Sequence, residues 1–575
     1  MIRPRFRIDN LSGWLLLASA LGYFLTVASL FLDKPGLETN EAFPGNDYLE
    51  ILQGPKRGLE YSLMTHYYEG TTVALLLIPL SAIFGFSVFL LRFIHIVFSI
   101  GSLLSIHFVT SRLFSPRIAI WTTLLMAFSP VFIRCTRIGN CRDEILMIFL
   151  FWFGLALATL AHETKKARWL YAAGFVMGIG LWTKIMFLGY LVGLGGALLV
   201  LGRRGLFPLR DRLFSTRIRV VGFAVSFLIG SLPFWTYNVL TNGKTFTSLW
   251  KNLWTPTYQR NNLDLLGNLG HRLANLWSII TQAISTDSAA TTGTNYVATV
   301  FFLISLGLVL GYLCFGKRAI VDKRMTLGCL AGYTILFVLT SFTPGPREPL
   351  HLAILFPAFQ LIAAIAVSIT TGACDGFRVV RRILPCLLIV PLLVSDAHGT
   401  VKYLSSISRG EISGYYDVVI YDIAKFLSRD EPDDEPVTVF ALSEYRIEVN
   451  VDVITRKRVR VRELVEFYPY NWRALEGTVE HKVQAIYEDE MAKEPDVILA
   501  VLTGGQYHDF STTGFRGFQK YLEGKGKRLV PQRTFKYHFE DVSLTIYEVT
   551  AVTSPPNGAD RPRPASRSDT RPLPP

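Results

Sequence analysis

Ionisable side chains lie beside the apolar segments of this sequence, at positions far apart along the chain. Carboxylates and imidazoles can exchange protons, and Lys and Arg side chains can bind anions. Charged groups at or inside a membrane are energetically costly, so each is a candidate for function. The candidates, in chain order, are Glu41, Asp47, Glu69, Arg137, Asp143, Glu144, Lys184, Arg347 and His351.

Each candidate also has an ordinary structural interpretation. Asp143 and Glu144 can stabilise the N-terminus of a helix, where the helix dipole favours acids. Lys184 can extend its ammonium group to the membrane interface. Arg347 lies in a loop rich in proline and can be a solvated charge there, and His351 can be a packing residue. The residue types alone leave both interpretations open.

The composition is that of a membrane protein. Half of the 575 residues are hydrophobic and 18% are charged, whereas soluble domains carry about a quarter charged residues. The 58 Lys and Arg residues exceed the 45 Asp and Glu residues by 13. Most of these basic residues flank apolar runs, where they orient membrane helices. We therefore attribute the excess to topology and expect no nucleic-acid partner.

The apolar runs predict eleven membrane spans. The first follows Arg3, Arg5 and Arg7, and it is longer than a signal-peptide core, so we interpret it as a retained helix. A further apolar stretch, 71–85, ends at Gly85 and is predicted to lie along the interface. The predicted spans are 11–32, 88–111, 118–134, 144–161, 169–184, 186–202, 220–240, 296–315, 326–342, 350–370 and 383–395.

The positions of the basic loops predict the orientation of these spans. With the N-terminus in the cytoplasm, every strongly basic loop falls on the cytoplasmic side, as the positive-inside rule requires. These loops are 112–117, 165–168, 203–219, 317–324 and 378–382. The loops that carry the candidate residues, 33–70, 135–143 and 343–349, then share the opposite side. A long polar section, 241–294, contains Trp250, Trp254 and Trp277, which suit an interfacial segment.

The chain changes character after residue 395. Strands are predicted at 437–442, 496–502 and 542–549, and helices at 417–427 and 515–522. Their alternation predicts a small extracytoplasmic α/β domain over residues 396–552. The transmembrane domain would then span residues 1–395. The tail 553–575, rich in Pro, Arg and Ser, is predicted to be disordered.

The six cysteines do not form a metal-binding pattern. They are scattered, with no CxxC pair and no Cys/His cluster, so they give no indication of a zinc site. Free cysteine behaves as a small buried hydrophobe, and we interpret most of these residues as packing residues. Cys135 and Cys141 could pair if their side of the membrane is oxidising.

Several short motifs together resemble a family of membrane glycosyltransferases. They include Asn40-Glu41 after the first span, Glu69-Gly70, and Arg137 six residues before Asp143. Others are Phe84-Gly85, Leu91-Arg92, Phe128-Ser129-Pro130, the Gly178–Lys184 run and Arg347-Glu348-Pro349-Leu350-His351. In their order and placement over residues 10–370, these motifs resemble the superfamily of protein O-mannosyltransferases and lipid A aminoarabinose transferases, which have the GT-C fold.

This resemblance implies an inverting transfer of a sugar from a polyprenyl-phosphate donor. A carboxylate of the first loop would act as general base for the acceptor, and Asp143 would orient the acceptor or the base. Lys184, Arg347 and His351 would hold the phosphate, where a bidentate Arg suits the oxygen geometry. Glu69 matches a glutamate near a metal site of that superfamily, so a divalent metal stays open. The acceptor would be a lipid, a glycan or a protein.

One position departs from the pattern of the superfamily. The first acid of its Asp-Glu pair falls on Asn40, and an amide cannot accept a proton at neutral pH. Either Glu41 or Asp47 takes that role, with Glu41 the first choice, or activity is altered or lost. The alternative function is therefore a non-catalytic membrane protein, either a transporter or a degenerate transferase-fold scaffold. An oligosaccharyltransferase ranks lower because the sequence contains no Trp-Trp-Asp motif.

Overall fold

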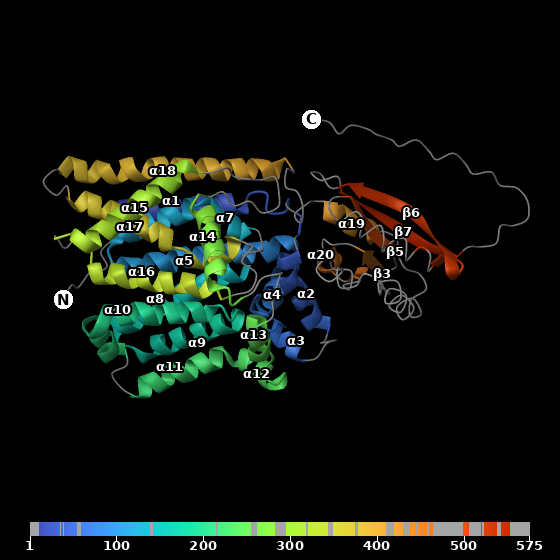
Figure 1. Cartoon of the computed structure of the whole chain (residues 1–575), viewed down its shortest axis with the longest axis horizontal. Helices are drawn as coiled ribbons and strands as arrows, with labels where there is room; N and C mark the ends of the chain where they lie inside the picture. The colour runs from blue at the N-terminus through green and yellow to red at the C-terminus, as the bar shows by residue number, and fades with distance from the viewer. Residues whose placement is uncertain are drawn as a thin grey trace, which may run out of the picture.

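The protein is mostly helical, with a small sheet near its C-terminus (Figure 1). Its apolar helices run side by side in one bundle, and the sheet lies beyond one end of that bundle. The computed structural model describes residues 11–34, 36–37, 39–53, 59–137, 142–213, 217–254, 262–281, 295–317, 320–342, 349–373, 378–409, 419–428, 437–442, 447–456, 459–463, 498–504, 519, 522–536 and 542–551.

Every predicted span coincides with a helix or a helix pair of the bundle. A 3₁₀ segment, η2 (Pro349–Leu355), begins the span that α17 continues. The helices of the bundle are α1 (Leu11–Ser29), α5 (Val88–Leu113), α6 (Pro116–Phe128), α7 (Pro130–Arg137), α8 (Arg142–Thr164), α9 (Ala167–Thr183), α10 (Phe187–Leu213), α11 (Arg217–Gly230), α12 (Leu232–Leu240), α15 (Tyr296–Phe315), α16 (Lys323–Thr340), α17 (Ala358–Ala373) and α18 (Arg378–Ser408).

Length and apolarity support crossing of a membrane for most of these helices. Within the described ranges, six are long and apolar enough on their own, and two bent pairs raise the number to eight. The remaining predicted spans correspond to α9, α10 and α16, which are shorter or less apolar. Many of their side chains are exposed leucine, valine and phenylalanine residues, which suits contact with lipid tails.

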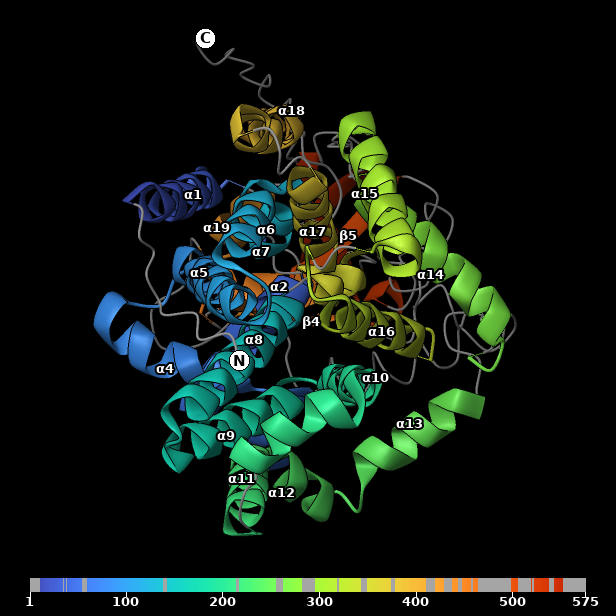
Figure 2. The same ribbon diagram turned by 90° about the vertical axis from the view of Figure 1, so that its left-hand side faces the viewer.

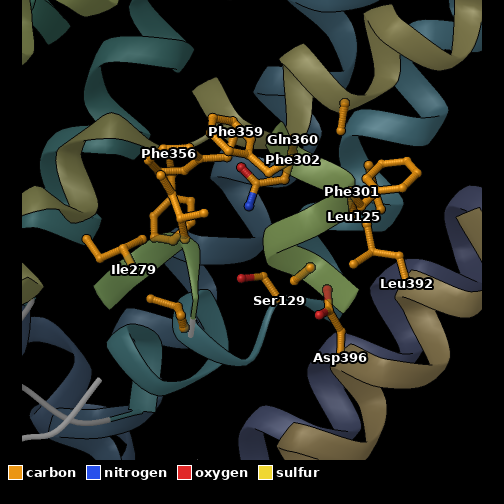
Figure 3. Close-up of a pocket in the computed structure, with 14 residues that line it drawn as sticks. Leu125, Ser129, Ile279, Phe301, Phe302, Phe356, Phe359, Gln360, Leu392 and Asp396 are labelled. Carbon is orange, nitrogen blue, oxygen red and sulfur yellow. The ribbon is translucent and has the colours of Figure 1, made fainter. Parts of the chain in front are cut away.

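Both bent spans break at a proline. The axes of α6 and α7 differ by 60° across Ser129 and Pro130, and those of α11 and α12 differ by 59° across Ser231. Pro130 begins α7, and Pro233 lies in the first turn of α12. Proline has no N–H and restricts the residue before it, so a helix ends there and another can begin. The first break places Ser129 between α6 and α7, inside the span, where it lines a pocket together with Gln360 (Figure 3).

The polar stretch after α1 is folded, although its sequence gave no periodic signal. It contains α2 (Thr39–Gln53), α3 (Leu59–Leu63) and a hairpin of β1 (Met64–His66) and β2 (Glu69–Gly70). The predicted interfacial segment forms α4 (Thr72–Phe84), which ends at Gly85 with φ of 75°. The polar section between α12 and α15 contains α13 (Lys244–Trp254) and α14 (Leu265–Ile280). Trp250, Trp254 and Trp277 are exposed on these two helices.

The C-terminal part contains a mixed five-stranded sheet. Its strands are β3 (Val437–Leu442), β4 (Val459–Glu463), β5 (Ile498–Gly504), β6 (Lys527–Lys536) and β7 (Val542–Ala551). The strand order is β4-β3-β5-β7-β6, with β3 parallel to both of its neighbours and β7 antiparallel to both of its own. β3, β5 and β7 confirm the predicted strands, whereas β4 and β6 were not predicted.

Two helices accompany this sheet. α19 (Val419–Leu427) confirms one predicted helix, and its apolar face packs in a core with Val439, Leu544 and Ile546. α20 (Ile447–Ile454) was not predicted. Most of the helix predicted at 515–522 lies outside the described residues. α18 continues to Ser408, past the predicted end of the last span.

α20 connects the sheet domain to the end of the helix bundle. It packs against α2, and Val453 belongs to the same core cluster as the residues of the bundle. Arg456, just after α20, donates a hydrogen bond of 2.9 Å from Nη2 to the Phe86 carbonyl oxygen. The Phe86 ring in turn stacks on Tyr48 of α2, with centroids 4.8 Å apart. The C-terminal domain therefore contacts α2, the helix that carries Glu41 and Asp47.

Candidate active site

Four of the predicted candidates meet at one cluster, in which Asp143, Glu144 and Lys184 are buried and His351 is partly exposed. Lys184, at the C-terminal end of α9, places Nζ 3.0 Å from Glu144 Oε1 and 3.5 Å from Asp143 Oδ2. His351 in η2 places Nδ1 3.1 Å from the same Glu144 oxygen. Three elements that are distant in sequence, the start of α8, the end of α9 and η2, thus converge. This confirms that these side chains are close in space, while their catalytic roles remain predictions.

The carboxylates of this cluster outnumber its ammonium group. The buried Lys184 ammonium group has Glu144 and Asp143 as its counter-charges, and these favour its charged form. Two carboxylates face this one ammonium group. The second oxygen of Glu144, Oε2, is buried and has no hydrogen-bond partner among the described residues. An unpaired buried oxygen is costly, and at such a site it can receive a donor from a substrate.

The β1–β2 hairpin is fixed to the residues around Lys184. Glu69 forms an antiparallel bridge with Lys184, and the Ile185 N–H donates to the Tyr68 carbonyl oxygen at 3.0 Å. The Trp182 indole N–H donates to the Leu63 carbonyl oxygen at 2.8 Å. Glu69 is buried, and its charge lies near Lys184. The hairpin therefore brings a third acid to the edge of the cluster.

Gly70 shows how tightly this hairpin is packed. A Cβ atom at this position would lie 2.3 Å from the Trp182 carbonyl oxygen and 2.7 Å from the indole ring. Neither neighbour can move easily, because one is backbone and the other is hydrogen-bonded. The Glu69-Gly70 motif thus has a physical reason: glycine allows the hairpin to approach the end of α9 closely enough to pair with Lys184.

Asp47 is connected to the cluster through the same hairpin. It is buried on α2 and accepts a hydrogen bond of 2.5 Å from the Thr65 hydroxyl on β1. Phe43, one turn earlier, contacts the ring of His66, with centroids 5.1 Å apart. α2 therefore packs on one side of the hairpin, and Lys184 pairs with the other strand.

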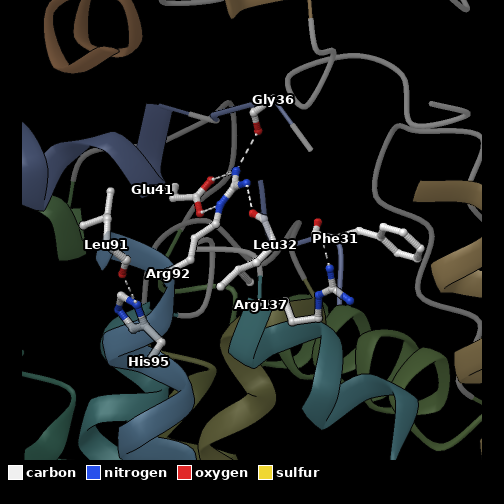
Figure 4. Close-up of polar contacts among 8 residues, drawn as sticks. All are labelled: Phe31, Leu32, Gly36, Glu41, Leu91, Arg92, His95 and Arg137. Carbon is white, nitrogen blue, oxygen red and sulfur yellow. Dashed lines mark hydrogen bonds and ion pairs between the residues drawn. The ribbon is translucent and has the colours of Figure 1, made fainter. Parts of the chain in front are cut away.

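Glu41 lies in a different environment, which Figure 4 shows. Its two carboxylate oxygens accept from Arg92 Nε at 2.5 Å and from Arg92 Nη2 at 2.8 Å. Arg92 also donates to the carbonyl oxygens of Leu32 and Gly36, which follow α1. Both partners are buried, at about 2% exposure. The sequence motif Leu91-Arg92 gave no indication of this pair, whose members are 51 positions apart.

Arg137 faces the end of α1 as well. It donates to the Val27 carbonyl oxygen at 3.3 Å. It also donates to the Phe31 carbonyl oxygen at 3.2 Å, which Figure 4 shows. Its guanidinium group lies 5.7 Å from the centre of the Tyr403 ring, and Arg134 lies 5.9 Å from the same ring. Arg137 Nε is buried and has no hydrogen-bond partner among the described residues. Arg137 therefore caps a helix and still has a donor available.

The remaining candidates lie outside the described residues. Arg347, predicted to bind the phosphate, falls in the gap 343–348, and the Asn40 side chain lies outside the described residues as well. Among the described residues, no group of three or more His, Cys, Asp and Glu side chains is placed to hold a metal ion. The Lys184 ammonium group stands between Asp143 and Glu144, where a cation would otherwise bind. The two carboxylates at this position therefore do not fit a divalent metal while Lys184 lies between them.

Part of the chain matches a described protein family. Residues 71–237, from the start of α4 to α12, match the family described as dolichyl-phosphate-mannose-protein mannosyltransferase. This range contains Asp143, Glu144 and Lys184, and it excludes Glu41, Asp47 and His351. No curated protein sequence matches the chain.

Solved structures with a similar fold extend over almost the whole chain. ArnT from Cupriavidus metallidurans bound to undecaprenyl phosphate has a TM-score of 0.59 and 12% identity, and the match covers 94% of this chain and 98% of that one. The same protein in its apo state also has a TM-score of 0.59 and 12% identity, with 93% and 98% coverage. AglB, an oligosaccharyltransferase from Archaeoglobus fulgidus in complex with an inhibitory peptide and a dolichol-phosphate, has a TM-score of 0.50 and 11% identity, with 93% and 75% coverage. At these identities the similarity establishes the fold, and it confirms the predicted polytopic helical membrane protein with a C-terminal α/β domain.

Proposed function

We propose that this chain is a membrane glycosyltransferase of the GT-C-fold superfamily of protein mannosyltransferases and ArnT-like proteins, which the family match and the similar fold support. The donor is a sugar linked to a polyprenyl phosphate. In the reaction, the acceptor hydroxyl gives its proton to a carboxylate, and its oxygen forms a bond to the anomeric carbon. The bond from that carbon to the phosphate oxygen breaks, and polyprenyl phosphate leaves with inversion of the anomeric centre.

The single observation that carries this proposal is the meeting of Lys184 with Asp143, Glu144 and His351. The cluster combines acids, which can accept protons or orient hydroxyl groups, with a buried cation, which can bind phosphate oxygens. It is formed by three elements that no local pattern would bring together. Buried ionisable groups that perturb each other in this way are more frequent at functional sites than elsewhere.

The general base is proposed to be Asp47, before Glu41. Both oxygens of Glu41 are already bound by Arg92, so a proton on this carboxylate would disrupt a buried bidentate pair. Asp47 accepts from a neutral hydroxyl on the hairpin that also contacts the Lys184 segment. Asp143 and Glu144 then orient the acceptor, and the free Glu144 Oε2 is available to accept a hydrogen bond from it.

The leaving phosphate requires positive charge. Phosphate esters leave well without a general acid when cations stabilise their oxygens. Lys184 and His351 are proposed for this role together with Arg347. Because Lys184 already faces two carboxylates, we propose that Arg347 supplies the additional positive charge.

The orientation and the domain limits remain part of the proposal. The distribution of basic loops supports an N-terminus in the cytoplasm and a C-terminal domain, residues 396–552, outside it. The candidate site and the C-terminal domain lie at the same end of the bundle, which is consistent with an acceptor that arrives from the extracytoplasmic side (Figure 1). A lipid, a glycan and a protein remain possible acceptors, and membrane lipids surround the bundle.

A non-catalytic role, as a scaffold with this fold, is the second candidate. It is favoured by the ion pair between Arg92 and Glu41, because this pair occupies the carboxylate next to Asn40. The two functions are separated by incubating the purified full-length protein with a panel of polyprenyl-phosphate sugars, together with lipid, glycan and peptide acceptors, and measuring release of polyprenyl phosphate. Release with one donor, abolished by Asp143→Asn, supports the transferase. Neither release nor binding with any donor, from protein that is folded, supports the scaffold.

A further inference from the structure

α13, the first of the two helices between α12 and α15, exposes an aromatic stripe. Phe246, Trp250 and Trp254 follow each other at intervals of four residues, so they share one face of the helix. Trp250 and Trp254 are 64% and 60% exposed, and their rings contact each other with centroids 5.6 Å apart. The residue that α13 buries is the polar Thr245. A helix that faces water does the reverse, with its apolar stripe toward the core.

α14, the second of these helices, shows the same inverted pattern. Leu266, Leu273 and Trp277 are exposed, and their spacing of seven and then four residues places them on one face. The residues that α14 buries include the polar Asn268 and Arg272. Leucine is usually buried in a water-soluble protein and arginine is usually exposed. The outward faces of α13 and α14 therefore suit an apolar environment better than water.

The position of both helices matches the surface of a bilayer. Figure 2, which views the bundle along its length, shows α13 and α14 at the edge of the bundle and extended in the plane of the view. They follow α12, whose Leu232 and Val239 are exposed as on a lipid-facing helix. Lys244 and Lys251 of α13 are exposed as well. Tryptophan on the apolar face and lysine beside it are typical of an amphipathic helix that lies in the head-group layer.

On its inner side, α13 is bonded to the turn of the β1–β2 hairpin. Thr245 donates from Oγ1 to the Tyr67 carbonyl oxygen at 2.6 Å. Asn252, two turns later, donates from Nδ2 to the Tyr67 hydroxyl oxygen at 2.5 Å. α13 therefore holds both the backbone and the side chain of Tyr67. Glu69, two residues further along the hairpin, pairs with Lys184.

A chain of asparagine side chains extends this link to α14. Asn262 donates to the Asn252 carbonyl oxygen, and Asn268 on α14 donates to the Asn262 carbonyl oxygen at 3.3 Å. Both Asn262 and Asn268 are buried. Polar bonds thus join α13, α14 and the hairpin on the inner side, while the apolar faces of the two helices point outward.

We propose that α13 and α14 bind the bilayer surface at the candidate-site end of the bundle, and that this lipid contact holds the β1–β2 hairpin in place through Tyr67. The partner is lipid, because the exposed faces continue the apolar surface of α12 and combine tryptophan with lysine. The hairpin pairs with Lys184, so the contact of α13 with lipid extends to the candidate site. The proposal concerns binding and local structure, and it does not depend on the transferase proposal.

The lipid contact is tested with the full-length protein in nanodiscs that contain a phosphatidylcholine with a diazirine group in its acyl chain, near the head group. After illumination, labelled residues are identified by mass spectrometry. We expect labels on the outward residues of α13 and α14 and on α15, and none on β6, whose side chains are mostly exposed but lie beyond the bundle. Labels on α15 without labels on α13 and α14 would overturn the proposal. A second copy of the chain bound to these faces would give that result.

The link to the hairpin is tested by hydrogen exchange of residues 59–71 in nanodiscs, without any sugar donor. Tyr67→Phe keeps the ring and removes one neutral hydrogen bond, so exchange should become about fivefold faster. Trp250→Ser/Trp254→Ser removes the exposed rings and should accelerate exchange at least as much.

Two controls show whether this effect requires the lipid contact. Trp250→Phe/Trp254→Phe keeps an aromatic stripe and should leave exchange slow. Phe315→Ser removes an exposed ring at the last residue of α15, without a bond to the hairpin among the described residues, and should change nothing. Hairpin exchange that Trp250→Ser/Trp254→Ser leaves unchanged would overturn the proposal, and so would equal acceleration by Phe315→Ser.

Discussion

Lys184 Nζ lies 3.0 Å from Glu144 Oε1, although the two residues are 40 positions apart and belong to different helices. This pair ties the start of α8 to the end of α9, and His351 approaches the same oxygen from η2. Because Lys184, Asp143 and Glu144 are buried, removing one charge leaves the others without compensation. Variants that remove one charge, or two opposite charges together, can therefore separate the effect on stability from the effect on catalysis.

Lys184→Met should destabilise the protein and abolish transfer. It leaves two buried carboxylates without their ammonium partner, and breaking a buried pair on one side costs about 3–5 kcal/mol. Adding Glu144→Gln removes one of these charges, so the double variant should recover most of the lost melting temperature. Transfer should stay absent in the double variant, because the cation proposed to bind the phosphate is missing. Recovery of transfer along with stability would show that Lys184 is only structural.

Asp47→Asn should mainly lower kcat, whereas Glu41→Gln should mainly lower the melting temperature. Asp47→Asn keeps an oxygen that can accept from Thr65, so the melting temperature should change little. Loss of the proposed base should lower kcat about 100- to 10,000-fold. Glu50→Gln, on the same helix, is the matched control and should leave both quantities unchanged.

Glu41→Gln leaves Arg92 without its buried counter-charge, so its main effect should be a lower melting temperature. Activity per folded molecule, measured at a temperature where the variant is folded, should be reduced less than in Asp47→Asn. If the order is reversed, with a stable but inactive Glu41→Gln, Glu41 is the base and Asp47 is not.

The sequence predicted the residues of the central cluster better than the partners of the first loop. Asp143, Glu144, Lys184 and His351 lie at the ends of strongly apolar segments, and the alternation of basic loops placed those ends on one side of the membrane. The topology therefore predicted that these four residues lie at the same face of the membrane. Their contacts with one another depend on helix packing, which the topology does not specify. The eleven spans were predictable for the same reason, since their lengths are set by the bilayer.

The loop between α1 and α4 could not be predicted in this way. α2 has little apolar periodicity and contains Pro44, and each strand of the β1–β2 hairpin is at most three residues long. The pairing of Glu41 with Arg92 depends on how this loop folds onto α5, which no local pattern specifies. The pocket around Gln360 is likewise formed by several separate helices, so its residues share no spacing in the sequence.

Gly70→Ala should disrupt the site through the hairpin. The added Cβ would lie 2.3 Å from the Trp182 carbonyl oxygen, so β2 must move away from Lys184. We expect transfer to fall by at least tenfold and the melting temperature to drop. Gly22→Ala is the control, because a Cβ there has no atom within 4 Å. Unchanged kinetics in Gly70→Ala would mean that the hairpin does not position the site.

Arg456→Ala should loosen the contact between the C-terminal domain and α2. It removes the hydrogen bond to the Phe86 carbonyl oxygen, and hydrogen bonds from charged groups contribute about 1.5–3 kcal/mol. Limited proteolysis should then cleave the C-terminal domain faster. Arg533→Ala, on β6 within the same domain, provides the comparison and should leave the cleavage rate much less affected. Equal rates in Arg456→Ala and the unaltered protein would show that this bond does not hold the domain.

The most direct test of the central claim is release of polyprenyl phosphate from a polyprenyl-phosphate sugar, measured for the unaltered protein and for the Lys184→Met/Glu144→Gln variant. We expect release by the unaltered protein, dependent on an acceptor, and none by the variant, with both proteins measured below their melting temperatures. Equal release by both proteins would contradict the claim that the cluster around Lys184 is the catalytic centre.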